Sequence, residues 1–171
     1  AVQVHTSITT GSIGEVRWLI PGVLTYFVRD GAQRRLFAAV TTDPANIDIF
    51  EIVSNLTAEE SVEELEFSGT DFLVRVDNEA AQTSRFLFGS VVFGSGGGLR
   101  EVATSQIRAP FCTDGAGSWA VVTNLDNPLR QELYFFDADS LPVLSRVSGP
   151  IVDNGRVTGC AFRPVFDIGG D

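Results

Sequence analysis

The chain has 171 residues, of which 44 % are hydrophobic and 20 % charged, and its formal net charge is −10. This apolar content is enough for a packed core, which excludes disorder as the main state, and no apolar run is long enough for a membrane-spanning helix. The negative charge repels phosphate backbones, so we expect no nucleic-acid partner. Because the chain has no long apolar run, we expect no membrane span.

Apolar runs along the chain have the composition of β-strands. The strongest runs, at 23–28, 72–76 and 119–123, are rich in β-branched and aromatic residues. Turn-forming pairs such as Asp30-Gly31 separate the runs. The glutamate-rich stretch 57–66 has too few apolar positions for an amphipathic helix, so we expect a solvated loop or a single turn there. The sequence therefore predicts an all-β fold.

The strong apolar runs recur at nearly constant spacing. Leu24, Phe72 and Trp119 open successive runs, 48 and 47 residues apart, and other runs precede and follow each of them. Four short strands therefore recur about every 47 residues. We divide this single domain into an N-terminal strand at 1–10, repeat units at approximately 15–55, 62–104 and 107–148, and a partial unit at 150–171.

This recurrence favours a β-propeller, since one four-stranded unit cannot bury both of its faces alone. Residues 132–147 resemble the third strand, tight turn and fourth strand of quinoprotein-like propellers. Residues 160–164 resemble the opening of TolB-like and WD40-like blades. The resemblance implies β-propeller-like, four-stranded antiparallel blades, about three and a half in this chain. A β-sandwich is the alternative, because regular turns fit it equally well.

Closed propellers have roughly four to eight blades, so a shorter arc leaves two large apolar faces uncovered. We therefore expect a protein partner, which is either the remainder of a longer propeller or a second copy of the chain. A further alternative is that Val2–Ile8 pairs with Val157–Phe162, within one chain or between two.

The two cysteines, Cys112 and Cys160, occupy matching places in successive units. Their separation does not fit a zinc site, and His5 is the only histidine. A disulfide and a pair of buried thiols both remain open, and a disulfide would accompany an extracellular or periplasmic location. Asn55 begins a glycosylation sequon, which has meaning only in a secreted eukaryotic protein.

Candidate chemistry is sparse. Asp137 and Asp139 are calcium candidates, although aspartate is also common at turns because it caps backbone N–H groups. Apart from that calcium, no cofactor is expected. The glycine run 94–98 precedes a strand, whereas a phosphate-binding loop precedes a helix. A single histidine near the N-terminus gives a Ser-His-Asp triad little support.

These observations favour a non-enzymatic binding or scaffold module, a propeller segment that mediates protein–protein association. The alternative is a carboxylate-dependent hydrolase, of glycosidase or phosphoesterase type, with its site at the centre of the propeller. In either case we expect Trp18, Trp119 and the phenylalanines to pack in the core where units meet.

Overall fold

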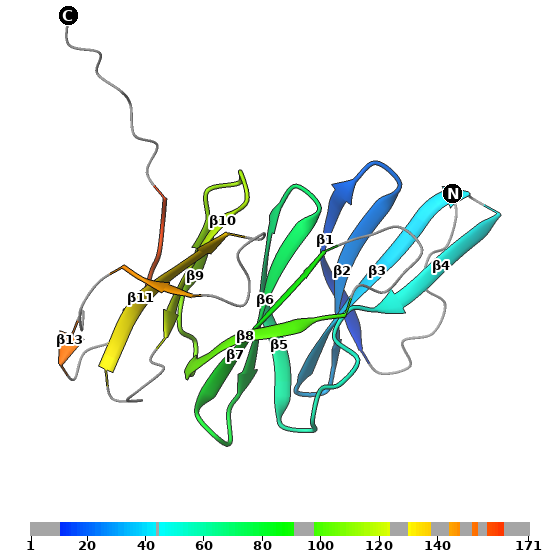
Figure 1. Cartoon of the computed structure of the whole chain (residues 1–171). Coiled ribbons are helices and arrows are strands. Elements are labelled where there is room, and N and C mark those ends of the chain that lie inside the picture. Colours follow the sequence, from blue (N-terminus) through cyan, green and yellow to red (C-terminus); the bar gives the residue numbers. More distant parts are fainter. Residues whose placement is uncertain are drawn as a thin grey trace, which may run out of the picture.

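The computed structural model describes residues 11–43, 45–90, 98–123, 130–137, 144–147, 152–153 and 157–162. The regular structure of these residues is entirely β, in three antiparallel sheets that stand side by side (Figure 1). Within the same residues there is no helix with the length and hydrophobicity needed to cross a membrane.

Sheet A is a meander in which each strand pairs with the next along the chain. Its strands are β1 (Ser12–Ile20), β2 (Val23–Asp30), β3 (Gln33–Asp43) and β4 (Asn46–Glu51). Gly22, in the turn between β1 and β2, has a positive φ of 85°, and a Cβ atom there would lie 2.6 Å from Cγ2 of Thr42. Only glycine therefore allows β3 to approach this turn so closely.

Sheet B repeats the same meander. Its strands are β5 (Glu60–Ser68), β6 (Asp71–Asn78), β7 (Thr83–Ser90) and β8 (Arg100–Gln106). The expectation of a solvated loop or turn over 57–66 is wrong for most of that stretch, because β5 begins at Glu60. The strand forms because Val62 and Leu65 pack into a core, and the Glu60 carboxylate is held by Arg85 at 2.7 Å.

Sheet C has the spatial order β12-β11-β10-β9. Its strands are β9 (Phe111–Thr113), β10 (Ser118–Thr123), β11 (Arg130–Asp137) and β12 (Ser145–Arg146), and β13 (Val152–Asp153) also pairs with β11. In each of the three sheets, the strand that comes first along the chain lies at an edge of the sheet. These edge strands are β1, β5 and β9.

Two apolar cores join the three sheets. The core between sheets A and B is built by buried residues of both sheets and of the connection between them, namely Phe27, Leu36, Val53, Val62, Leu65, Phe72, Val74, Val76 and Leu87. The core between sheets B and C contains Leu73, Phe86, Ala103, Ala109, Phe111, Trp119, Val121, Tyr134 and Phe136. Sheet B is thus covered on both faces. The described residues therefore form three layers and not the two layers of a β-sandwich.

Hydrogen bonds reinforce the contact between sheets A and B. The Gln33 side chain donates to the carbonyl oxygens of Thr57, at 2.9 Å, and Glu60, at 3.1 Å. Nη1 of Arg34 donates to the carbonyl oxygen of Glu63 at 2.8 Å. These bonds satisfy backbone groups of the segment that leads into β5 and of β5 itself, which fixes the two sheets relative to each other.

The two tryptophans have opposite environments. Trp119 is fully buried and meets the ring of Phe88 edge-on, with 6.0 Å between centroids. Trp18 is 67 % exposed, so the expectation that it packs in the core is wrong. The difference arises because Trp119 lies between sheets B and C, whereas Trp18 lies on β1, on the face of sheet A that points away from sheet B.

Candidate functional site

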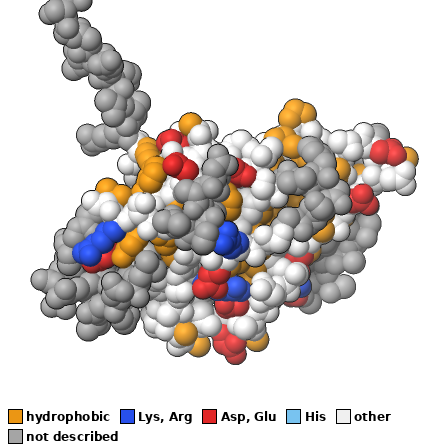
Figure 2. Space-filling model, viewed as in Figure 1, with side chains coloured by type: hydrophobic (Ala, Val, Ile, Leu, Met, Phe, Trp, Pro, Cys, Tyr) orange, Lys and Arg blue, Asp and Glu red, His pale blue; other side chains and the backbone are white. Residues whose placement is uncertain are grey.

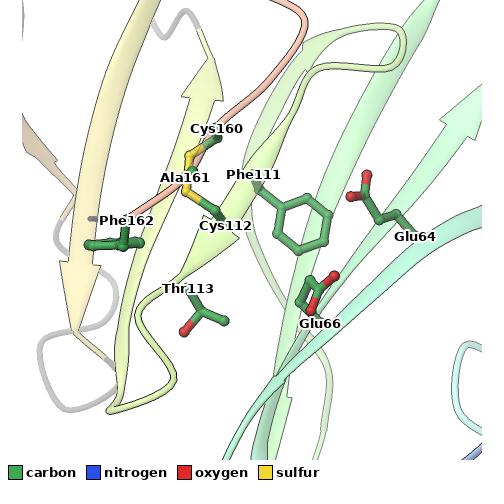
Figure 3. A pocket seen from close by; sticks show the side chains of 8 residues that line it. All are labelled: Glu64, Glu66, Phe111, Cys112, Thr113, Cys160, Ala161 and Phe162. Atoms are coloured by element: carbon green, nitrogen blue, oxygen red, sulfur yellow. A yellow bond between two sulfur atoms is a disulfide. The ribbon is translucent and has the colours of Figure 1, made fainter. Parts of the chain in front are cut away.

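A hollow of about 330 Å³ opens between the first strands of sheets B and C (Figure 3). The C-terminal segment 157–162 forms its third side. The lining residues come from these three elements and are Glu64, Glu66, Phe111, Cys112, Thr113, Cys160, Ala161 and Phe162. In Figure 3 the ring of Phe111 lies between the two glutamates and the two cysteines. The hollow is therefore acidic on one side and apolar on the other.

The glutamates of the hollow come from one side of β5, since residues two apart on a strand point the same way. The Glu64 carboxylate forms an ion pair with Arg75 of β6. Burial raises the pKa of Glu64 above its ordinary value, the charge of Arg75 opposes this shift, and repulsion from Glu66 and Asp77 adds to it. Glu64 therefore keeps its proton to a higher pH than a solvated glutamate does.

A buried polar network holds Arg75 in place behind the hollow. Nε of Arg75 donates to Oδ1 of Asp77 at 3.0 Å, and the Ser84 hydroxyl donates to the same oxygen at 2.6 Å. The backbone N–H of Arg108 in turn donates to Oγ of Ser84 at 2.7 Å. Asp77 is almost completely buried, so its charge requires these partners. The network thus serves the junction between sheets B and C.

The cysteines bring the C-terminal segment onto sheet C. The Sγ atoms of Cys112 and Cys160 are 1.99 Å apart, and their Cα atoms, 5.6 Å apart, have a spacing that a disulfide requires. Cys112 pairs with Ala120, so it lies on the face of sheet C that points away from sheet B. On that face the Phe162 ring meets Phe135 edge-on, with 6.4 Å between centroids.

The calcium candidates are only partly described. Asp137 is exposed at the end of β11, where its Oδ1 accepts a hydrogen bond of 3.0 Å from the Ser118 hydroxyl. Asp139 lies outside the described residues. Among the residues that the structure covers, no three His, Cys, Asp or Glu side chains are grouped to hold a metal ion. A calcium site at Asp137 and Asp139 stays a prediction.

The remaining sequence candidates also stay predictions. Asn55 is exposed in the loop between β4 and β5, where a glycan would find space. His5 and most of the glycine run 94–98 lie outside the described residues. Sequence reasoning missed Glu64 and Glu66 as residues of a hollow, because it assigned them to a loop. The signal that could have found them is the repeat itself, which aligns 60–68 with the first strand of each unit.

The comparisons with known proteins bear on the fold. No family model matches the sequence, and a search of curated proteins found no match. Among solved structures the chain is similar to the β-propeller domain of the Trilobed protease from Pyrococcus furiosus, which is described as having an open velcro topology. The TM-score is 0.50 and the identity 10 %, over 84 % of this chain and 44 % of that chain.

At this identity the likeness concerns the fold alone. It confirms the expectation of an all-β chain with propeller-like, four-stranded antiparallel blades, without pointing to a particular propeller family. The chain spans less than half of the length of the propeller chain that it matches, 44 % of it.

The disulfide can be tested by thiol labelling. We expect unreduced protein to take up no label when unfolded, and reduced protein to be labelled at Cys112 and Cys160. The bond closes a loop over 48 residues, so its reduction is expected to lower the free energy of unfolding by about 4 kcal/mol in a chain-entropy model. Labelling of both cysteines without reductant would contradict the disulfide.

The raised pKa of Glu64 predicts a pH dependence of stability. A glutamate whose pKa is higher in the folded than in the unfolded state contributes its full stability below the unfolded-state pKa. That contribution disappears as the pH rises through the folded-state pKa of Glu64. We therefore expect the free energy of unfolding, relative to Glu64→Gln, to decrease from about pH 4 towards neutrality. Denaturant titrations over this range measure it. In an NMR titration, Glu66→Gln should lower the pKa of Glu64, because it removes the repulsion from Glu66. A wild-type Glu64 pKa at or below the ordinary glutamate value would refute this pH dependence.

Proposed function

We propose that this chain is a non-enzymatic binding or scaffold module, a propeller segment that associates with protein through exposed apolar side chains on the face of sheet A that points away from sheet B. We also propose an extracellular or periplasmic location, which the Cys112–Cys160 pair favours. The observation that carries the proposal is a difference between the first sheet and the next two. Among the described residues, those at corresponding positions pack against a neighbouring sheet in sheets B and C but not in sheet A.

The strand registers define these corresponding residues. Trp18 of β1 is opposite Leu24 in sheet A, as Phe67 of β5 is opposite Phe72 in sheet B. Phe72 and Phe67 belong to the core between sheets A and B. Leu24 instead joins a separate small cluster in sheet A. The face that sheet B turns towards sheet A therefore has a counterpart in sheet A that points away from sheet B.

We call this counterpart the open face. Its apolar members alternate along the strands with residues that face sheet B, and they are Ile13, Val16, Trp18, Leu24, Tyr26, Val28, Phe37, Ala39, Ile47 and Ile49. The registers place the ion pair of Arg35 and Glu51 on the same face. Tyr26, Val28 and Ala39 form its buried centre. Ile13, Val16, Trp18 and Ile49 are exposed apolar side chains at its margins.

Exposed apolar side chains gathered on one face mark an interaction surface. In the view of Figure 2, apolar side chains reach the surface over sheets A and C, and acidic side chains are spread between them. The exposed part of the open face carries the large side chains that contribute most to protein association, above all Trp18. Another propeller blade is the partner whose chemistry matches it, because the same positions of sheets B and C already bind one.

The proposal predicts association that depends on the open face. At micromolar concentration we expect the chain to sediment as more than a monomer, and Trp18→Glu to weaken this association at least tenfold, because it places a charge among exposed apolar residues. Phe50→Glu is the control, since Phe50 is also exposed on sheet A but lies opposite Ala38, off the open face. The proposal would be refuted if the chain sediments as a monomer at every concentration and an added quencher reaches the exposed Trp18 freely throughout.

A carboxylate-dependent hydrolase is the second candidate, and the hollow is what favours it. Glu64, with its raised pKa, has the property of a general acid, and Glu66 places a second carboxyl group in the same hollow. This candidate predicts hydrolysis of aryl glycosides or phosphoesters, reduced about 100-fold by Glu64→Gln or Glu66→Gln. The exposed Glu59→Gln serves as control. Absence of turnover with either substrate class would reject this candidate.

A further inference from the structure

We propose that the Cys112–Cys160 disulfide is a redox-sensitive latch on the wall of the hollow. A dithiol that enters the hollow reduces the bond, and segment 157–162 then leaves sheet C, so that the hollow opens on this side. Reoxidation returns the segment to its place. The three sheets keep their fold in both states, and the latch does not depend on the association proposed for sheet A.

The two cysteines are held very differently by the rest of the chain. Cys112 lies in β9, which pairs with β10, and its neighbour Phe111 belongs to the core between sheets B and C. All six residues of segment 157–162, which carries Cys160, lie outside the strands of the sheets. When the bond breaks, β9 therefore stays in sheet C, and the segment is the part that can move.

Apart from the disulfide, one hydrogen bond and one ring contact join segment 157–162 to the described residues of sheet C. The Val157 N–H donates to the side-chain oxygen of Gln131, and the Phe162 ring meets Phe135 edge-on. Three of the six residues of the segment are exposed. Ordering the segment removes backbone freedom at each residue, and two contacts of this kind offset only part of that loss. The covalent bond is therefore what keeps the segment in place.

A reductant reaches the disulfide through the hollow. Both cysteines line this space of about 330 Å³ (Figure 3). Cys160 is half-buried, whereas Cys112 is only 9 % exposed. Because thiol–disulfide exchange requires a thiolate to touch one of the two sulfurs, the Sγ atom of Cys160 is the one that an entering thiolate attacks.

The exchange balances with a dithiol as the reductant. One thiolate of the dithiol attacks Sγ of Cys160 and forms a mixed disulfide, and Cys112 leaves as a thiolate. The second thiolate then attacks the dithiol's own sulfur in the mixed disulfide, which frees Cys160 and closes the reductant into a cyclic disulfide. Two electrons pass from the dithiol to the protein, and the two thiol protons of the dithiol pass through water to Cys112 and Cys160.

The acidic side of the hollow makes this reaction sensitive to the charge of the reductant. Glu64 and Glu66 line the same space as the two cysteines. The charge of Glu64 is compensated by Arg75, so Glu66 contributes most of the repulsion. We therefore expect an anionic thiol to be slowed by Glu66, and a thiol whose ammonium group balances its thiolate to be unaffected.

Amide hydrogen exchange in the native protein tests the release of the segment. After reduction with dithiothreitol we expect the Val157 N–H, which Gln131 holds in the oxidised protein, to exchange at least tenfold faster. The Val122 N–H donates to the Pro110 carbonyl oxygen at 3.1 Å within sheet C, so its exchange rate is the control and should not change. Circular dichroism verifies that the sheets persist. Reoxidation should restore the slow exchange of Val157.

A variant without the bond gives the released state by substitution. The double variant Cys112→Ser, Cys160→Ser has no thiol to oxidise, so its Val157 N–H should exchange as in the reduced wild type and ignore dithiothreitol. Chymotrypsin provides a second readout, because Phe162 is half-buried in the oxidised protein. Cleavage after Phe162 should be at least tenfold faster in the reduced wild type and in the double variant.

Reduction rates test the route through the hollow. With 2-mercaptoethanesulfonate at low ionic strength, Glu66→Gln should raise the rate at least twofold, because it removes a charge that repels this doubly negative thiolate. With cysteamine, whose ammonium group balances its thiolate, the rate should not change. Glu59→Gln alters the net charge equally at an exposed position outside the hollow and should leave both rates unchanged. Equal effects of the two variants would overturn this route.

Three further results would overturn the latch. If both cysteines of the reduced protein take up a thiol label while Val157 keeps its slow exchange, other contacts hold the segment. If reduction abolishes the β signal in circular dichroism or the protection of Val122, the bond holds the whole fold and not one segment. If dithiothreitol reduces the bond only when denaturant unfolds the protein, the hollow gives no access to it.

Discussion

A four-stranded sheet with apolar side chains on both faces cannot be stable by itself in water, and this constraint governs the whole structure. In sheet B, Phe72, Val74 and Val76 point to one side, and Leu73 and Phe86 point to the other, so this sheet requires a cover on both. Sheet B meets the requirement completely, between the core that contains Val74 and the core that contains Phe86. Among the described residues, sheets A and C have a neighbouring sheet on one side only.

A buried polar network around Arg75 lies where sheets B and C meet along their first strands. There the backbones of β5 and β9 belong to different sheets, and side chains rather than backbone pairing must connect them. Arg75 does so by reaching Glu64 and Asp77 on its own sheet and, at 3.4 Å, the carbonyl oxygen of Ala109 beyond it. The hollow with its two glutamates is thus a consequence of how the blades are joined, and any ligand or reaction there would use groups already engaged in holding the fold together.

Much of the architecture could be predicted from the sequence, because apolar periodicity reflects the covering of strands. The spacing of Leu24, Phe72 and Trp119 predicted a repeated four-stranded antiparallel unit, and these residues lie in the second strands of the three sheets. The glutamates of β5 misled the prediction, since local composition does not show that Arg75 and Arg85 compensate their charges. Trp18 misled it in the opposite way, because a residue suited to a core is buried only where a neighbouring sheet covers it.

The sequence by itself determined that the chain is all-β, that its strands recur in units of one length, and that its cysteines occupy matching places in successive units. Those properties depend on residue type and spacing, which are local. Only the tertiary structure decided that Cys160 returns to Cys112, that Glu64 and Glu66 face a hollow, and that Trp18 stays uncovered while Trp119 is buried. These depend on which sheet lies next to which, a relation between segments far apart in the chain that no local pattern encodes.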